Sequence, residues 1–511
     1  MQGDRERDSA ASGAGDATER AAPQGAFAPD LGAASEMEDG SSALARIGLF
    51  AGPILAAIAV TATHPGAGAL GGLSADASWV LGLFAFMATW WITLAVDPAI
   101  TALLPFVTLA VLGLGKPSEI AAPYANDVMF LFAGGSLLAL ALDRGGVSKR
   151  FAAGVIAVAG SSPLMVLAAV MLATALMSAF VSNLATTATM LPFAIALAAR
   201  VRAGAADEEG RRAASRFATS LFLGIAFASS IGGALTPVGS PPNPIAIEEL
   251  EKQGVQMDFL RWMSFSVPAT ALMLPLSIVV LGVWFFPARG VRVPRETTRP
   301  EPLGRDGWLA LAVFGCALTA WVTSPLWDEQ FKMVREGTVA VSAAAVLFLL
   351  PSSARRGEGI LAPKDFGQVP WRVLVLFGGG LCLADAMQRT GLSASLGTIF
   401  ESAGALPAIG VLAVVVAVLV FASEVASNTA LSAMAVPIVA AIAPALGLEP
   451  QALVIPAVFA ASWAFAMPVG TPPNALVFAS GQVRARDMMR VGLVLDLVAI
   501  AVIVTMAKLL L

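Results

Sequence analysis

The sequence has very few of the residues on which catalytic, metal-binding and disulfide-bonded proteins depend. Its 511 residues include one histidine, His64, and two cysteines, Cys316 and Cys382. His64 lies in a Gly- and Pro-rich connection, and both cysteines lie in apolar runs. A disulfide framework or a zinc site needs several ligands with local spacing, and a catalytic triad needs a histidine. This inventory excludes histidine–metal clusters and triads, and we expect that the protein is not an enzyme.

Charged side chains are also scarce. Only 13% of the residues are Asp, Glu, Lys or Arg, whereas 57% are hydrophobic. Soluble domains carry about 25% charged residues, and a soluble globule of this length cannot hide so much apolar surface. Long uncharged runs separated by polar clusters are typical of a polytopic helical membrane protein. The composition excludes a soluble enzyme, a nucleic-acid-binding protein and a secreted disulfide scaffold, and a net charge of −4 indicates no charged partner.

The apolar segments predict an all-α membrane fold. Residues 1–45 are polar and lack apolar periodicity, so we expect a disordered tail. From Arg46 onward, eleven segments are predicted to cross the membrane: 46–63, 77–96, 99–115, 128–142, 216–247, 262–287, 308–323, 338–351, 372–388, 451–480 and 488–509. Two further stretches, 163–200 and 406–446, are too long for one crossing and too short for two. Each has a polar cluster near its middle, so we expect two re-entrant hairpins.

The basic residues predict the orientation of these segments. With a cytoplasmic N-terminal tail, and with hairpins that do not change sides, most of the 31 Lys and Arg residues fall in cytoplasmic connections. This asymmetry agrees with the positive-inside rule. We therefore expect an integral protein of the bacterial inner membrane, in contact with lipid and with its N-terminus in the cytoplasm.

Three sequence blocks occur twice, in the same order. FAGGSLLALALDRGGV at Phe132 pairs with FGGGLCLADAMQRTGL at Phe377, and SNLATTATMLP at Ser182 pairs with SNTALSAMAVP at Ser427. TPVGSPPNPI at 236–245 pairs with MPVGTPPNAL at 467–476. The first pair lies in predicted spans four and nine, an odd offset, so the two copies cross the membrane in opposite directions. Such an inverted-topology repeat is typical of secondary transporters, whose sites lie near the membrane midplane.

The duplicated polar blocks interrupt helices at membrane depth. The paired prolines and the glycine of each G-[ST]-P-P-N block cannot continue an α-helix. Broken backbone within a bilayer is tolerated when it is buried in protein or lines a wet cavity. Its carbonyl groups and the Ser, Thr and Asn oxygens are suitable ligands for sodium. The SN blocks lie at the hairpin tips, where helix N-termini favour an anion.

Three acidic residues lie within apolar segments. Glu424 precedes the second SN block, and we weigh a functional role evenly against a structural cap on loop N–H groups. For Asp385 and Asp496 we expect packing or rim roles. The pair Trp90–Trp91 is predicted to anchor the chain at the membrane interface.

At the paired SN and G-[ST]-P-P-N blocks, the sequence resembles the divalent anion:sodium symporter family, whose members carry dicarboxylates, citrate or sulfate. The resemblance covers the chain from about residue 46 to its end. It implies a homodimer in which each protomer has a scaffold and a mobile transport domain. We expect the scaffold at 46–142 and 288–388, and the transport domain at 143–287 and 389–511, with broken helices at 216–247 and 451–480.

The resemblance also implies which residues bind. The first sodium ion would be held by Ser178, Ser182, Asn183 and backbone near Gly239, and the second by Ser423, Ala426, Asn428 and backbone near Gly470. The substrate carboxylates would meet Asn183 and Leu184 on one side and Asn428 and Thr429 on the other, with Ser240, Pro241, Thr471 and Pro472 lining the cavity. Leu184 stands where the family usually has threonine, so one hydroxyl is missing.

We therefore predict sodium-coupled symport of small divalent anions, C4-dicarboxylates first, by an elevator-type movement. Sodium is the coupling ion rather than a prosthetic group. An exchanger, or a carrier of sulfate or another oxyanion, is the alternative within the same fold. A membrane enzyme would need a charged or metal-binding constellation that the sequence lacks, and duplicated hairpins fit occlusion better than an open channel.

Overall fold

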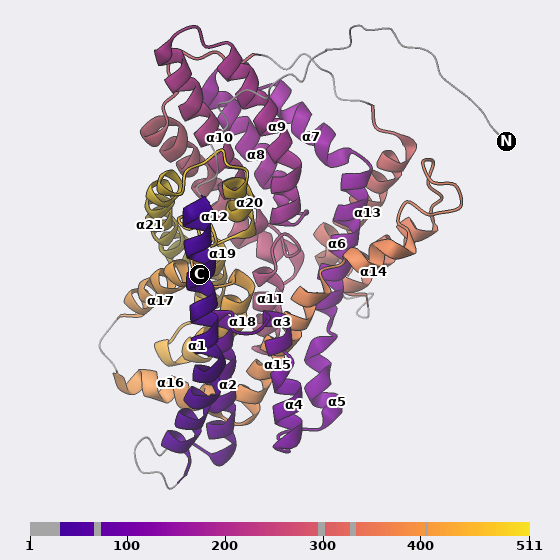
Figure 1. Ribbon diagram of the computed structural model, residues 1–511. Helices are drawn as coiled ribbons and strands as arrows, with labels where there is room; N and C mark the ends of the chain where they lie inside the picture. The colour runs from indigo at the N-terminus through magenta and orange to yellow at the C-terminus, as the bar shows by residue number, and fades with distance from the viewer. Residues whose placement is uncertain (1–30, 66–72, 295–301, 328–333, 404–406, 511) are drawn as a thin grey trace, which may run out of the picture.

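The computed structural model is helical throughout the residues that it describes, which are 31–65, 73–294, 302–327, 334–403 and 407–510 (Figure 1). Within these ranges the one β-type pairing is an isolated bridge between Pro351 and Gly359. In the described part of the chain, eight helical segments are long and apolar enough to cross a membrane, and several shorter apolar helices lie between them. The structure confirms the prediction of an all-α polytopic membrane protein.

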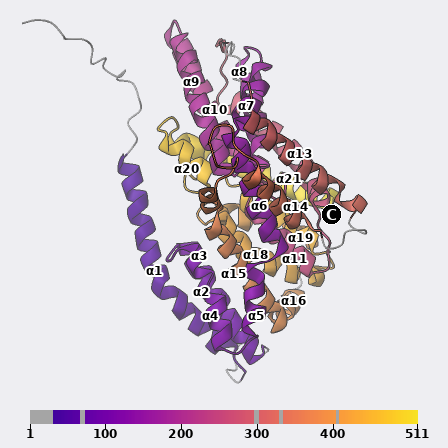
Figure 2. The same cartoon turned by 90° about the vertical axis from the view of Figure 1, so that its right-hand side faces the viewer.

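The segments predicted as scaffold contain the first group of helices. They are α1 (Leu31–Thr63), α2 (Ala75–Thr93), α3 (Pro98–Thr101), α4 (Leu104–Val111), α5 (Pro117–Ala121), α6 (Asp127–Arg144), α13 (Arg305–Trp327), α14 (Glu336–Leu349) and α15 (Trp371–Arg389). Figure 2 shows α1 along one edge of the molecule. This helix begins at Leu31, so residues 31–45 of the predicted disordered tail are helical. Residues 1–30 lie outside the described part of the chain.

The remaining helices hold the two hairpins and the two broken helices. They are α7 (Val147–Ala157), α8 (Pro163–Ser178), α9 (Asn183–Ala203), α10 (Glu208–Gly233), α11 (Pro242–Lys252), α12 (Phe259–Val279), α16 (Leu392–Ala403), α17 (Ala408–Ser423), α18 (Asn428–Ile442), α19 (Gln451–Ser462), α20 (Pro472–Ala479) and α21 (Ala485–Leu510). A π-helical turn at Val280–Phe285 follows α12. The predicted hairpins are therefore α8–α9 and α17–α18.

Glycines of the duplicated FxGG block allow helices from the two halves of the chain to pack closely. In α6, a Cβ atom on Gly134 would lie 2.6 Å from the backbone carbon of Ala340 in α14. In α15, a Cβ atom on Gly379 would overlap the backbone of Ala102, which follows α3. Small residues are the usual means of close helix approach in membranes. Each half of the chain thus contributes a glycine-bearing helix that packs on the other half.

A buried carboxylate anchors the connection between α14 and α15 onto α6. Asp365 is fully buried, and it accepts hydrogen bonds from Arg144 and from the Ala362 N–H at 2.8 Å. Burial raises the pKa of Asp365, but these hydrogen bonds and the charges of Arg144 and Arg355 hold it below its ordinary value. The carboxylate is therefore ionised at neutral pH and fixes the loop to the helix.

Candidate substrate and cation site

The serine of each SN motif caps the second arm of its hairpin. Ser182 Oγ accepts a hydrogen bond from the Ala185 N–H at 3.4 Å, at the start of α9. Ser427 Oγ accepts one from the Ala430 N–H at 3.5 Å, at the start of α18. Serine is a preferred N-cap because its side chain pairs an N–H group that the helix leaves free. The tip of each hairpin therefore carries the N-terminus of the second helix, as the sequence predicts.

The asparagine of each P-P-N block ties back the unwound chain before it. Asn243 Nδ2 donates to the carbonyls of Gly233 at 2.9 Å and Thr236 at 2.8 Å, ten and seven residues earlier. Asn474 Nδ2 donates to the carbonyls of Ala464 at 3.5 Å and Met467 at 3.1 Å, again ten and seven residues earlier. These bonds hold carbonyls that proline and glycine release from the helix. The sequence analysis did not assign this role, although both asparagines recur in the repeat.

We expect Asn474→Ala to destabilise the purified protein by about 1–3 kcal/mol, because two backbone carbonyls lose their donor while they stay buried. The measurement is thermal unfolding in detergent, and Asn243→Ala should behave alike because its bonding pattern is the same. Gln482→Ala, which removes an exposed contact to Arg202, is the control and should leave the melting temperature unchanged. An unchanged melting temperature in both asparagine variants would contradict the bracing role.

Oxygen atoms converge where the first hairpin meets the first break. Ser178 Oγ donates to Asn183 Oδ1 at 2.8 Å and lies 3.2 Å from Ser229 Oγ. A Cβ atom on Gly239 would lie 2.6 Å from the carbonyl oxygen of Gly233 and 3.0 Å from that of Ser178. Only glycine fits this position. The structure therefore places Ser178, Asn183 and Gly239 in one oxygen-rich cluster, while the Ser182 side chain serves as the N-cap.

A second cluster lies where the second hairpin meets the second break. Asn428 Nδ2 donates to the Ser462 carbonyl at 3.5 Å, and Ser423 Oγ donates to the Val420 carbonyl at 2.7 Å. A Cβ atom on Gly470 would lie 2.9 Å from Glu424 Oε2. Ala426, at the hairpin tip, is buried. The predicted second set is thus gathered along the contact between hairpin and break.

These clusters suit a small hard cation. Among the described residues, the buried oxygens without a hydrogen-bond partner include Asn428 Oδ1, Ser462 Oγ, Asn243 Oδ1 and Asn474 Oδ1. An unpaired buried polar group costs about 1–3 kcal/mol. Neutral amide, hydroxyl and carbonyl oxygens are the ligand types that hard cations accept. The residues present therefore fit sodium at the two hairpin–break contacts.

Each broken helix packs against the hairpin of the other half of the chain. Helix α11, which follows the first break, packs against α18 of the second hairpin, and α20, which follows the second break, packs against α9 of the first. Figure 1 shows α11 and α18 near the middle of the molecule and α9 in its upper part. The helix that follows each P-P-N block thus lies beside the arm that follows the SN motif of the other half.

The predicted substrate residues differ in exposure. Buried members are Ser240, Thr429 and Thr471, the last of which also caps α20 by accepting the Asn474 N–H at 3.2 Å. Asn183, Asn428 and Pro241 are half-buried, and Pro472 is exposed. Leu184 is 49% exposed, so its apolar side chain faces open space rather than the core.

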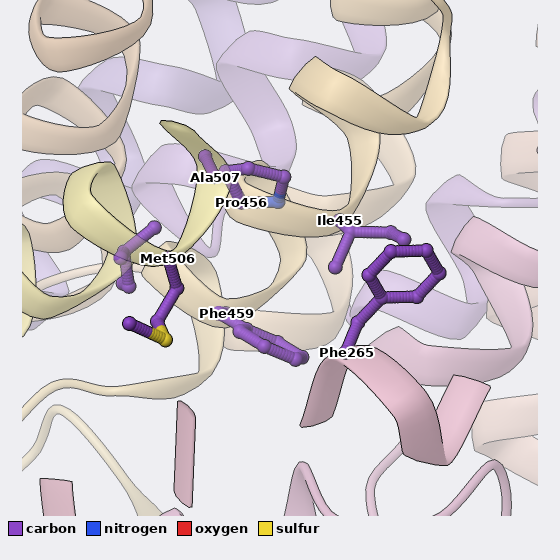
Figure 3. Close-up of a pocket in the computed structure, with 7 residues that line it drawn as sticks. Phe265, Ile455, Pro456, Phe459, Met506 and Ala507 are labelled. Carbon is purple, nitrogen blue, oxygen red and sulfur yellow. The ribbon is translucent and has the colours of Figure 1, made fainter. Parts of the chain in front are cut away.

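The pocket drawn in Figure 3 is a different feature. It is lined by apolar side chains of α12, α19 and α21, among them Phe265, Phe459 and Met506. No predicted site residue lines it. A pocket without polar groups offers nothing to hold an anion in place.

Two of the acidic candidates and one tryptophan make defined contacts within the protein. Glu424 accepts hydrogen bonds from three successive N–H groups of the second break, which is the capping role that the sequence left open. Asp385 forms an ion pair with Lys252 at 2.6 Å. Trp91 is fully buried and donates from Nε1 to the Pro98 carbonyl at 3.0 Å, so the interfacial role predicted for it is wrong. Sequence could not reveal this because α3 folds back over α2.

Comparison with known proteins decides the family. A model of the citrate transporter family, CitMHS, matches residues 88–455. The chain belongs to the citrate transporter family. As a member of this family it is an integral membrane protein, in agreement with its apolar helices.

Relatives of this citrate-family transporter match over most of its length. The sodium-dependent dicarboxylate transporter SdcS of Staphylococcus saprophyticus is 33% identical over 471 residues, which cover 90% of each chain. SdcS of Staphylococcus aureus strain USA300 is 31% identical over 474 residues, covering 90% of this chain and 89% of the relative. The crystal structure of the Alcanivorax borkumensis YdaH transporter, described as having an unusual topology, shares the fold with a TM-score of 0.57. Its sequence identity is 15%, and the match covers 79% of this chain and 88% of that one.

Proposed function

We propose that this protein is a secondary active transporter that couples sodium to the symport of small divalent anions. C4-dicarboxylates are the proposed main substrates, and no enzymatic activity is expected. The observation that carries the proposal is the meeting of two capped helix N-termini with two braced helix breaks that hold buried, unpaired amide oxygens. The names of the SdcS relatives support the same substrate and ion.

Electrostatics indicates which groups would bind the anion and which would bind the cations. The N-termini of α9 and α18 offer N–H groups and partial positive charge to the two carboxylates of the substrate. Asn183 and Asn428 add neutral donors. Sodium ions at the two oxygen clusters supply the remaining positive charge when bound, so that anion and cations favour each other's binding.

We infer an inverted-topology repeat with an elevator movement. Support comes from reciprocal contacts: the first FxGG glycine of each half packs within the scaffold, and the second meets the transport domain. A Cβ atom on Gly135 would lie 3.2 Å from Val238 Cβ in the first break, and one on Gly380 would lie 2.7 Å from Ala433 Cβ in α18. Small residues at this boundary suit a sliding surface. A homodimer with cytoplasmic N-termini in the bacterial inner membrane completes the proposal.

Polar contacts between the two proposed units gather at the end of α11. They include Lys252 with Asp385 at 2.6 Å, Arg335 with Glu251 at 2.9 Å, and Gln388 with Glu249 at 3.2 Å. A sliding transport domain would have to break them. The two ion pairs are partly exposed, so each is weak enough to be broken, whereas Glu249 is buried and its contact with Gln388 would have to be replaced.

Uptake of radiolabelled succinate into proteoliposomes tests the proposed function. We expect saturable uptake that rises with an inward sodium gradient and disappears when potassium replaces sodium. Efflux that needs succinate on the opposite side, with no response to sodium, would instead indicate an exchanger. A linear, unsaturable flux would reject a carrier.

One observation favours testing a wider set of anions. Leu184 stands exposed at the N-terminus of α9, whereas the equivalent residue at the start of α18 is Thr429. The first tip therefore lacks the second hydroxyl that Thr429 gives the other tip. Competition by malate, citrate and sulfate belongs in the same uptake assay.

A further inference from the structure

The two helix breaks are held by groups of opposite character. Alignment of TPVG with MPVG makes Ala234 and Leu235 the counterparts of Phe465 and Ala466. In the first break, Trp262 Nε1 donates to the Ala234 carbonyl at 3.0 Å and Ser266 Oγ donates to the Leu235 carbonyl at 2.6 Å. Both donors lie on α12 and are neutral. The first break is thus held without any charge.

The second break is held by carboxylates. Glu424 Oε1 accepts from the N–H groups of Phe465 at 2.6 Å and Ala466 at 2.8 Å, and Oε2 accepts from Met467 at 2.5 Å. Asp496, on α21, accepts from the same Phe465 N–H at 3.1 Å through Oδ1. The two carboxylates therefore meet at a single amide group.

One carboxylate oxygen of Asp496 has no hydrogen-bond donor. Its side chain is fully buried, and Oδ2 has no hydrogen-bond partner among the described residues. The ion pairs that the structure resolves between described side chains do not include Glu424 or Asp496. Among the described residues, the pair thus has three N–H donors and no ion pair with a basic side chain.

Three N–H groups satisfy one carboxylate, not two. Glu424 takes all three donors and is thereby stabilised as an anion. A second buried carboxylate beside it is disfavoured by desolvation and by like-charge repulsion unless a cation binds both. The unpaired, buried Oδ2 of Asp496 is a ligand position for a hard cation, and a cation bound there would stabilise Asp496 as an anion.

We propose that Glu424 and Asp496 form a third cation site, which binds sodium in addition to the two at the hairpin–break contacts. The proposal rests on the sodium-coupled function proposed above. Gly470 adjoins Glu424, so the site borders the second cluster, and the same hairpin and break serve both. Two sodium ions and a divalent anion move no net charge, whereas a third ion makes each cycle carry one positive charge inward.

The number of coupled ions tests this site. In proteoliposomes at zero membrane potential, succinate accumulates until net flux stops, and a tenfold sodium gradient multiplies that accumulation about tenfold for each coupled ion. We expect Asp496→Asn to lower the accumulation ratio about tenfold relative to the native chain. An inside-negative potential should accelerate uptake by the native chain and not by the variant.

Asp487→Asn is the matched control. It makes the same chemical change on α21, in the first turn of the helix. We expect native accumulation and native voltage response from it. Asp496→Ser provides a second variant if the asparagine variant does not insert stably, and it should lose the same single ion.

Each other outcome is decisive. Equal accumulation and equal voltage response in the native chain and both Asp496 variants would overturn the third site. Acidification of the vesicle lumen during native uptake, lost in Asp496→Asn while the sodium count is unchanged, would overturn sodium in favour of a proton. If the native chain shows no sodium dependence at all, the proposed function fails, and this proposal fails with it.

Discussion

Asn428→Ala is expected to abolish sodium-driven succinate uptake. The asparagine reaches the second break through Ser462, while its Oδ1 is buried without a partner at the start of α18. The substitution removes a cation ligand and an anion donor together, and each hydrogen bond to a charged group is worth about 1.5–3 kcal/mol. The combined loss lowers uptake by about a hundredfold or more at substrate concentrations near the native half-saturation value.

Asn183→Ala should behave in the same way, because Asn183 occupies the equivalent position and bonds Ser178 at 2.8 Å. The matched control is Asn126→Ala, which removes an N-cap from α6 in the proposed scaffold. We expect this control to keep most of its uptake. Near-normal sodium-dependent uptake by either Asn183→Ala or Asn428→Ala would remove that residue from the site.

A disulfide between Gly135→Cys and Val238→Cys is expected to stop transport completely and reversibly. These positions join α6 of the proposed scaffold to the first break of the proposed transport domain, and their Cβ atoms would be 3.2 Å apart. Disulfides need a Cβ–Cβ distance of about 3.5–4.5 Å, so a small adjustment allows the bond. Uptake is measured after oxidation and again after reduction, in a chain whose Cys316 and Cys382 are replaced by serine.

A cross-link within one proposed unit controls for damage caused by the disulfide itself. Gly397→Cys with Ala445→Cys would join α16 to the turn after α18, and a Cβ atom on Gly397 would lie 3.7 Å from Ala445 Cβ. Both positions belong to the proposed transport domain, so this bond should leave transport intact. If the Gly135–Val238 disulfide forms fully and uptake persists, the transport domain does not slide past α6, and local movement of the hairpins becomes the better mechanism.

Local signals in the sequence determined the helical elements and where they are interrupted. Uncharged runs gave the membrane helices, because backbone polar groups in lipid must be paired within a helix or a closed barrel. Ser182 and Ser427 predicted helix starts, since an N-cap bonds within its own first turn. The prolines and glycines of the GxPPN blocks predicted the breaks for the same reason: their effect on the backbone acts over a few residues.

The tertiary structure decided what these elements do to one another. The bonds from Glu424 to the second break span more than 40 residues, and those that join Trp262 and Ser266 to the first break span 28 and 31. Asp496 is an ordinary acidic residue in an apolar run until α21 packs beside that break. Composition cannot show this, because contacts between distant segments depend on which helix faces meet.

The tertiary structure also decided how the two halves of the chain pack on each other. Repetition in the sequence predicted two similar units, but not that α11 would pack on α18 and α20 on α9. Nor did it predict that Asn243 and Asn474 would brace the breaks rather than only face the ions. Sequence patterns indicate short-range backbone preference and burial. The shared site depends instead on backbone N–H and C=O groups that the helix breaks leave unpaired, and side chains distant in sequence pair them.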